Sequence, residues 1–172
     1  FVKTDTERSL FNRKKRGNKM ILKEKEKTVL QDLQTQEKSC MEKYEKYAQQ
    51  AKDPVLKDLF LDLQKKEQEH YNSITGILNG GEVPDSNCND SDGANYMPTA
   101  TYDTMSESED KTSDCFLATD CIGTEKLVSS EYNSDVFVFQ NTKLRKLLAD
   151  IQVEEQNHAE MLWKYKTVNG MA

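Results

Sequence analysis

The chain has little of what many folds and sites require. Its 172 residues include only 7 Gly and 3 Pro, too few for the many turns of an all-β protein. No apolar run approaches the roughly 18 residues that a membrane-spanning helix needs, and the mean hydropathy is −0.85. The chain has only 2 His and 4 Cys, so any site built on histidine can use at most two of these side chains. These features predict a soluble, mostly helical protein with no membrane partner.

The charge is acidic overall and unevenly distributed. The chain holds 24 basic and 30 acidic residues, a net charge of −6, which gives no reason to expect a nucleic-acid partner. Residues 1–19 contain seven of the basic and two of the acidic residues, so the remainder carries −11. The basic run 13–16 is either a solvated tail, which we favour, or a patch for nucleic acid or localisation.

Residues 1–19 are expected to be a disordered or non-native basic leader. Arg16-Gly17-Asn18-Lys19 stand directly before Met20 and can be encoded by a purine-rich stretch that resembles a bacterial ribosome-binding site read in frame. We therefore hypothesise that translation starts at Met20 and that residues 20–172 form one domain.

Four segments have the apolar pattern of a helix with one buried face. Apolar residues recur there at intervals of three and four, predicting helices at about 24–51, 54–78, 116–139 and 142–167. Breaks at Asp53-Pro54 and near Asn141 make each successive pair antiparallel. The segment 80–115 is expected to be an exposed acidic crossover, with nine acidic residues and one Lys between 79 and 114. The sequence thus predicts an all-α fold, an antiparallel four-helix bundle made of two helical hairpins and one long crossover.

The two hairpins are related by an internal repeat. At an offset of 88 positions, ten of the 34 residues from 37 to 70 are identical to their counterparts, whereas chance gives roughly two. The alignment needs no gap. Both histidines of the chain, His70 and His158, are among the matched residues.

Six ionisable residues interrupt the apolar faces of the predicted helices. In the first hairpin, both glutamates are 15 residues from position 52, the centre of the turn, and in the second hairpin both are 15 residues from position 140. Each histidine follows the second glutamate of its hairpin by three residues. The carboxylates are therefore expected at one level of the bundle. The predicted set is Glu37, Glu67, His70, Glu125, Glu155 and His158.

The chemistry of this set points to metal. An unpaired carboxylate in an apolar interior costs several kcal/mol, and two divalent cations would neutralise four. Glu-x-x-His places an oxygen and a nitrogen ligand on one helical face, and hard oxygen ligands with some imidazole favour iron or manganese over zinc or copper. We expect all six residues to be ligands of two Fe or Mn ions, and no other cofactor. The alternative is a buried hydrogen-bonded polar cluster without metal.

With these motifs, the sequence resembles the ferritin-like superfamily, specifically its rubrerythrin-like branch, over nearly all of 25–167. The segments 25–33, 42–44, 131–139 and 151–158, with the ending Asn169-Gly170-Met171, look more narrowly like the coat F family of spore coat proteins. The motifs that carry the superfamily resemblance are Glu37 with Tyr44, Glu67 with His70, Glu125 with Tyr132, and Glu155 with His158.

The resemblance implies a di-metal centre in which Glu37 and Glu125 are candidates for the bridging position. It also implies a place in the spore coat or cytoplasm of a spore-forming bacterium, with other coat proteins or further copies of the chain as partners. The chain departs from rubrerythrins in having Val128 where they carry a further carboxylate, and in lacking paired Cys-x-x-Cys motifs. Peroxide reduction by the rubrerythrin route is therefore not expected.

These residues and the resemblance leave three functions open. The first is a di-metal oxidoreductase acting on peroxide or oxygen, and the second is a structural spore coat protein in which metal only stabilises the bundle or is absent. The third, iron storage, requires a closed shell that a sequence does not reveal. We take the chain to be a metal-binding coat F-like protein; whether it is an enzyme stays open, and no catalytic residue is assigned.

Several neighbouring residues have simpler interpretations. Tyr44 and Tyr132 lie two turns from the glutamates and are expected to pack in the core with a hydrogen bond to a ligand. Glu154 either replaces a ligand or, more commonly for such a residue, faces solvent. Cys40 and Cys121 fit small core positions. The remaining pair, Cys88 and Cys115, flank the crossover and are candidates for a disulfide.

Overall fold

A computed structural model describes residues 20–85 and 91–171. The expected basic leader 1–19 and Cys88 lie outside these residues, so the leader and the Cys88–Cys115 disulfide stay predictions. Every regular element in the described part is helical, which confirms the predicted all-α class. The elements are α2 (Glu24–Gln50), α3 (Pro54–Leu78), α4 (Asp92–Asn95), α5 (Glu109–Asp135), the 3-10 helix η1 (Val136–Val138) and α6 (Thr142–Val168).

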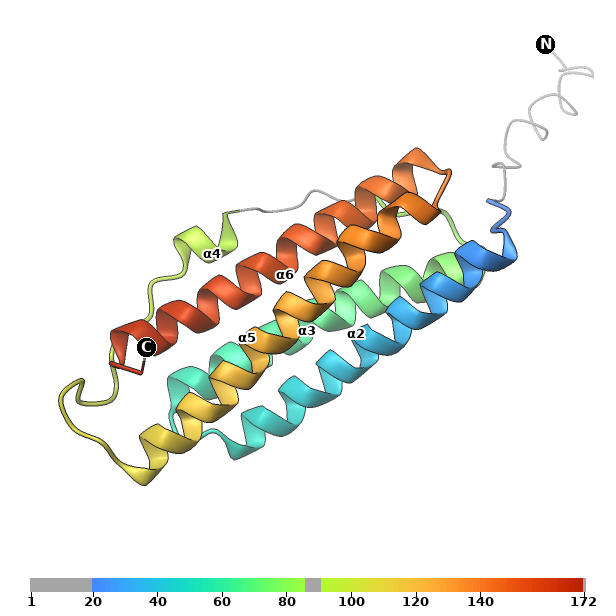
Figure 1. Cartoon of the computed structure of the whole chain (residues 1–172). Helices are drawn as coiled ribbons and strands as arrows, with labels where there is room; N and C mark the ends of the chain where they lie inside the picture. Colours follow the sequence, from blue (N-terminus) through green and yellow to red (C-terminus); the bar gives the residue numbers. More distant parts are fainter. Residues whose placement is uncertain (1–19, 86–90, 172) are drawn as a thin grey trace, which may run out of the picture.

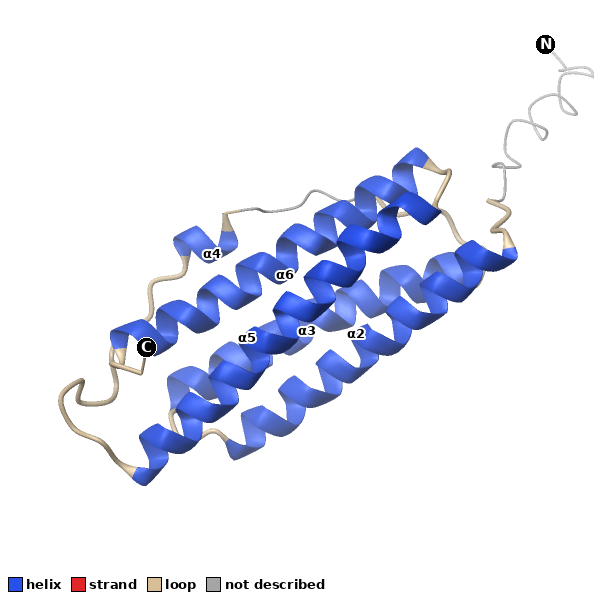
Figure 2. Cartoon of the chain, in the orientation of Figure 1, coloured by secondary structure: helices blue, strands red, loops and turns tan. Residues whose placement is uncertain are grey.

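Four long helices lie side by side and form the body of the molecule (Figure 1). α2 packs along α3 as one hairpin, and α5 packs along α6 as the other. Contacts of α2 with α5 and of α3 with α6 join the two hairpins, and the short α4 packs on the outside of α6. Only helices and connecting loops are drawn for the described residues (Figure 2). This arrangement directs one face of each long helix toward a shared interior.

The two tight turns use the same chemistry at positions related by the repeat. The side chain of Asp53 accepts a hydrogen bond from the backbone N–H of Val55 at the start of α3, where Pro54 occupies the first helical position. Asn141 accepts in the same way from Leu144 N–H at the start of α6. Such side chains satisfy backbone donors that a helix start leaves unpaired. Each hairpin turn is therefore encoded locally.

The third long helix begins earlier than the apolar pattern predicted. α5 starts at Glu109 rather than near 116, and it ends at Asp135 with η1 completing the expected range. Ser108 caps α5 by accepting a hydrogen bond from Lys111 N–H, and the acidic residues Glu109 and Asp110 occupy the first turn, where negative charge interacts favourably with the helix dipole. Two of the acidic residues that suggested a loop, Glu109 and Asp110, therefore form the start of a helix.

The crossover is also more ordered than expected. It contains α4, whose carbonyls at Gly93 and Ala94 accept hydrogen bonds of 2.6 and 2.9 Å from Lys164 Nζ on α6. Lys111, expected in an exposed loop, is 2% exposed, and its ammonium donates to the carbonyls of Asp103 and Ser106. These contacts hold the crossover against the bundle.

One buried carboxylate joins the first tight turn to the crossover and to α5. Asp114 is fully buried and accepts hydrogen bonds from the backbone N–H groups of Lys52 and Asp53 at 2.9 and 2.8 Å. The hydroxyl of Tyr102 donates to the same carboxylate. Asp114 thereby satisfies polar groups of three segments that are far apart in the sequence.

The apolar core is divided into two clusters. One includes Leu30, Ile74, Val128 and Leu148, from the beginnings of α2 and α6 and the ends of α3 and α5. The other is centred on the opposite end of the bundle and includes Phe60. Cys40 belongs to the first cluster and Cys121 to the second, which confirms the prediction that both are small core residues. Between the clusters lies a polar layer.

Candidate metal centre

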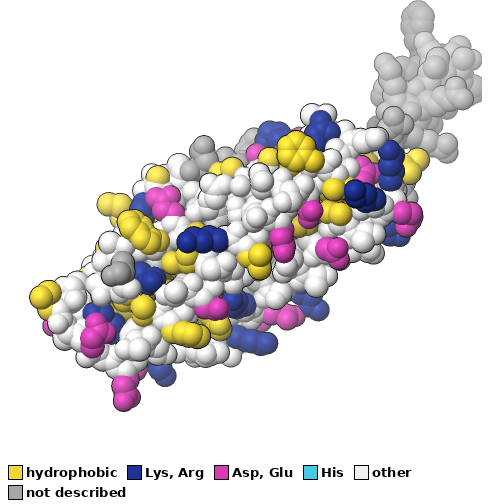
Figure 3. Space-filling model, viewed as in Figure 1, with side chains coloured by type: hydrophobic (Ala, Val, Ile, Leu, Met, Phe, Trp, Pro, Cys, Tyr) yellow, Lys and Arg dark blue, Asp and Glu magenta, His cyan; other side chains and the backbone are white. Residues whose placement is uncertain are grey.

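The polar layer consists of the six residues that interrupt the apolar pattern of the sequence. α2 and α5 each contribute one glutamate, whereas α3 and α6 each contribute a glutamate and a histidine. None is more than 4% exposed, and neither histidine is visible on the face drawn in Figure 3. The structure thus brings together Glu37, Glu67, His70, Glu125, Glu155 and His158.

The six side chains form two overlapping groups of four. In each group, one nitrogen or oxygen atom per residue lies within 4.8 Å of such an atom of every other member. Glu37 and His70 belong only to the first group, and Glu125 and His158 only to the second, while Glu67 and Glu155 belong to both. The shared position is therefore held by the glutamates of α3 and α6. The resemblance had suggested Glu37 and Glu125 for it.

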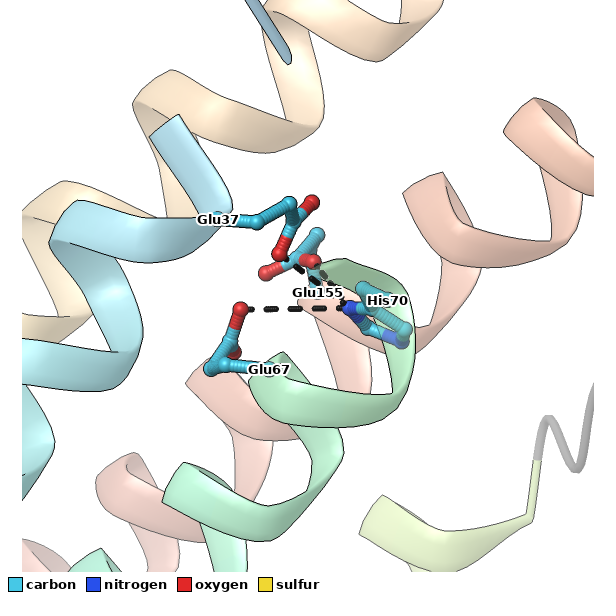
Figure 4. A group of neighbouring side chains, drawn as sticks. All are labelled: Glu37, Glu67, His70 and Glu155. Carbon is cyan, nitrogen blue, oxygen red and sulfur yellow. Dashed lines mark ion pairs between the residues drawn. The ribbon is translucent and has the colours of Figure 1, made fainter. Parts of the chain in front are cut away.

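In the first group, three carboxylates surround one nitrogen of His70 (Figure 4). The distances from Nδ1 are 3.1 Å to Glu155 Oε1, 3.5 Å to Glu37 Oε2 and 3.8 Å to Glu67 Oε2. The nearest of these oxygens belongs to α6, the helix opposite the histidine. The two Glu-x-x-His motifs therefore reach across the bundle toward each other.

The second group repeats this arrangement. The Nδ1 atom of His158 lies 2.9 Å from Glu67 Oε1, 3.6 Å from Glu155 Oε2 and 3.7 Å from Glu125 Oε2. The rings of His70 and His158 are nearly parallel, with centroids 5.9 Å apart. The internal repeat thus appears in the site as an approximate two-fold symmetry.

Eight buried atoms of these residues have no hydrogen-bond partner. The short nitrogen–oxygen distances above do not have the geometry of hydrogen bonds. An unsatisfied buried polar group costs about 1–3 kcal/mol, and more when it is charged. The atoms are Oε2 of Glu37 and Glu125, both carboxylate oxygens of Glu67 and Glu155, and Nδ1 of His70 and His158. Lone pairs directed at a common interior are the arrangement that a bound cation requires.

The remaining oxygens of the two outer glutamates are held by buried tyrosines. The Tyr44 hydroxyl of α2 donates to Oε1 of Glu125 on α5, and the Tyr132 hydroxyl of α5 donates to Oε1 of Glu37 on α2. This confirms the prediction of core tyrosines bonded to the site, with each bond crossing between the hairpins. Each tyrosine holds one oxygen of its glutamate and leaves the other oxygen directed inward.

Burial and crowding shift the protonation of the site. Burial raises the pKa of Glu37 to about 7 and raises the pKa of Glu155 well above its usual range. For Glu67, burial acts in the same direction, but the adjacent imidazoles prevail and lower its pKa. Burial opposes the charged form of both histidines, yet the surrounding carboxylates raise their pKa values. Without cations, protons are therefore shared among these groups.

The donor set fits two divalent cations. Each group of four offers carboxylate oxygens and one imidazole nitrogen, and four carboxylates match the charge of two such ions. Hard oxygen donors with one imidazole suit iron or manganese, whereas zinc and copper favour sites richer in nitrogen or sulfur. The residues present therefore fit the metal pair that the sequence led us to expect.

One family model matches part of the chain. Residues 113–172 match the model of the Coat F domain. This match covers about a third of the chain, and it supports the resemblance to the coat F family. The comparisons with curated proteins and with solved structures gave no match.

The Coat F segment, residues 113–172, contains most of α5 and all of α6. It includes Glu125, Glu155 and His158 but not the first hairpin. Because both groups of four use glutamates from both hairpins, the Coat F segment does not form either group alone. The site depends on the repeat, which extends the pattern to residues outside the Coat F segment.

Glu154 has a contact that neither interpretation of the sequence anticipated. Its Oε2 atom lies 2.5 Å from Nε2 of His70, on the side of the ring that faces away from the centre. The side chain is 27% exposed, so Glu154 neither joins the two groups nor points freely into solvent. The only signal for Glu154 in the sequence is its position beside Glu155. The contact with His70 depends on how α3 and α6 are aligned, and no local sequence pattern reports that alignment.

Proposed function

We propose that the chain is a spore coat protein whose four-helix bundle is ferritin-like and holds two Fe or Mn ions in the buried polar layer. The observation that carries this proposal is the convergence of eight polar atoms without a hydrogen-bond partner in an otherwise apolar interior. Without cations, only ion pairs with the two histidines offset the desolvation cost of these carboxylates, and none of the eight atoms gains a hydrogen bond. Two cations would satisfy all eight.

The positions of the residues suggest which of them would bind each ion. Glu37 and His70 would hold one ion, and Glu125 and His158 the other, with Glu67 and Glu155 shared between them. Tyr44 and Tyr132 would hold the outer carboxylates in orientation by their hydrogen bonds. When bound, the metal pair would supply electron exchange with peroxide or oxygen.

A purely structural role is the second candidate, and the enclosure of the site favours it. Each of the six residues is almost fully buried, so metal would cross-link four helices far from the surface. Ions that bind only the folded state stabilise it by an amount that grows with the logarithm of their concentration relative to the dissociation constant. In this case, the metal is absent or contributes to the stability of a coat component without turnover.

The Coat F match supports the proposed setting. We infer a place in the spore coat or cytoplasm of a spore-forming bacterium, with other coat proteins or further copies of this chain as partners. Among the described residues, no helix has the length and apolar character needed to span a membrane.

Measurement of the metal content tests the proposal. Protein purified without chelator is expected to contain about two equivalents of Fe or Mn per chain, as four carboxylates would neutralise two such ions. The double variant Glu67→Gln/Glu155→Gln removes the shared carboxylates and should lose the metal. The matched control is Glu42→Gln/Glu45→Gln, which changes two exposed glutamates of α2 and should keep it. Less than one equivalent in the unmutated protein would rule out the site.

Peroxide consumption then separates the two candidate functions. The metal-loaded protein is assayed with hydrogen peroxide and a chemical reductant, beside the double variant. Turnover that disappears with the metal supports the oxidoreductase. Full metal content without turnover supports the structural coat protein.

A further inference from the structure

The two halves of the candidate centre are alike at every inward contact. Glu67 and His70 correspond to Glu155 and His158 at the repeat offset of 88. The 3.1 Å contact from His70 Nδ1 to the glutamate of the opposite helix corresponds to the 2.9 Å contact of His158. The contacts of 3.5 and 3.7 Å to the outer glutamates correspond in the same way.

The symmetry ends at the outer side of the histidines. His70 Nε2 lies 2.5 Å from Glu154 Oε2, and the repeat counterpart of Glu154 is Lys66. An ammonium has no lone pair with which to accept a hydrogen bond from an imidazole. The three carboxylates that pair with His158 all lie at its Nδ1 atom, and none in the described part of the chain pairs with Nε2.

We propose that Glu154 is a positioning residue that makes the two metal positions unequal, so that the His70 half binds its ion more tightly than the His158 half. This inference rests on the proposed metal site. Glu154 itself would touch neither ion, because it lies on the far side of the His70 ring. It acts through the imidazole.

The physical basis is the hydrogen bond on the outer nitrogen. When Nε2–H donates to Glu154, the proton is held on that nitrogen, and the lone pair of Nδ1 faces the carboxylates of the centre. The carboxylate also increases the basicity of the ring and fixes its orientation. Loss of such an outer partner typically weakens metal binding by about 10–100-fold. Lys66, the repeat counterpart of Glu154, carries a positive charge 3.8 Å from Glu69 and offers no acceptor for a hydrogen bond.

Titration of the metal-free full chain with Mn²⁺ by calorimetry tests the inference. The unmutated protein should bind two ions in two steps whose affinities differ by about tenfold or more. Glu154→Gln should weaken the tighter step by about tenfold and leave the weaker one nearly unchanged, so that the steps converge. Lys66→Glu should strengthen the weaker step, because it places a carboxylate at the corresponding position.

Two controls separate positioning from general charge effects. Asp85→Asn removes a carboxylate from the same outer pocket, which Asp85, His70 and Glu154 line together, and should leave the ratio of the two affinities unchanged, because Asp85 pairs with the exposed Lys143. Lys66→Gln removes the positive charge without adding an acceptor and should strengthen the weaker step less than Lys66→Glu does. Thermal unfolding of each metal-free variant verifies that it is folded.

The outcomes distinguish this inference from the function on which it rests. Two ions bound with equal affinity, or an affinity ratio that neither Glu154→Gln nor Lys66→Glu changes, would overturn the inequality and leave the two-metal site standing. If the unmutated protein binds no Mn²⁺, both proposals fail.

Discussion

At the residue scale, the candidate centre depends on which buried atoms have partners and which do not. Glu37 illustrates the division: Oε1 accepts a hydrogen bond from Tyr132, whereas Oε2 has no hydrogen-bond partner. One oxygen is thus held in place and the other is available to a ligand. The same division applies to Glu125, which Tyr44 holds. Removing a tyrosine hydroxyl should therefore affect both stability and metal binding.

The variant Tyr132→Phe should lower the free energy of unfolding by about 1–3 kcal/mol, because it leaves a buried carboxylate oxygen without a donor. It should also weaken Mn²⁺ binding, since Glu37 loses its fixed orientation. Chemical denaturation and calorimetry measure the two effects. Tyr71→Phe, on a half-buried tyrosine of α3, is the control and should change neither by a comparable amount.

Metal affinity should decrease as the pH falls through about 7. The pKa of Glu37 is raised by burial to about 7, so protons compete with metal for this carboxylate below that pH. The pKa values of both histidines are raised as well, so their nitrogens also hold protons that a metal must displace. Calorimetric titrations with Mn²⁺ between about pH 5 and about pH 8 measure the dependence. Affinity that is constant over this range would contradict the buried, proton-sharing site.

Most of the candidate site was predictable from sequence because each member breaks an apolar pattern. A glutamate at a core position of a periodic helix is detectable without a structure, and the repeat pairs each one with a counterpart. The shared role of Glu67 and Glu155 and the contact of Glu154 with His70 were not predictable. Both depend on how α3 and α6 face each other, which no local pattern specifies.

At the element scale, the helix starts show where local sequence determines structure. Asp53-Pro54 and Asn141 mark the starts of α3 and α6, and the structure has them at the expected positions. The sequence predicts too late a start for α5 because acidic and polar residues suit both an exposed loop and a helix N-terminus. The buried contacts of Asp114 distinguish the two, and they come from the distant turn at 52–53.

The variant Asp114→Ala should destabilise the protein by about 2–4 kcal/mol, because two backbone N–H groups and the Tyr102 hydroxyl lose their acceptor. Asp110→Ala changes an exposed residue in the same part of α5 and should cost less than about 1 kcal/mol. Urea denaturation of both variants gives the comparison. Equal effects would mean that Asp114 does not join the crossover to the turn.

At the scale of the whole molecule, the two hairpins contribute equally to a layer that separates two apolar clusters. Neither hairpin contains a complete group of four, so metal would join α2 and α3 to α5 and α6. The stability of the whole bundle should then depend on metal. This expectation holds for the oxidoreductase and for a structural coat protein that binds metal.

Chelation should therefore lower the melting temperature, and added Mn²⁺ should restore it. An excess of 1,000 times the dissociation constant corresponds to about 4 kcal/mol of stabilisation. Differential scanning calorimetry with and without chelator measures the shift. The double variant Glu67→Gln/Glu155→Gln should show no response to Mn²⁺, and a response equal to that of the unmutated protein would place the stabilising metal elsewhere.

The most direct test of the two-metal centre is anomalous X-ray diffraction from crystals of the Mn²⁺-loaded protein. We predict two anomalous peaks in the polar layer, one beside Nδ1 of His70 and one beside Nδ1 of His158, with the carboxylates of Glu67 and Glu155 between them. Crystals soaked in Mn²⁺ that show no anomalous peak among these six residues would contradict the two-metal centre.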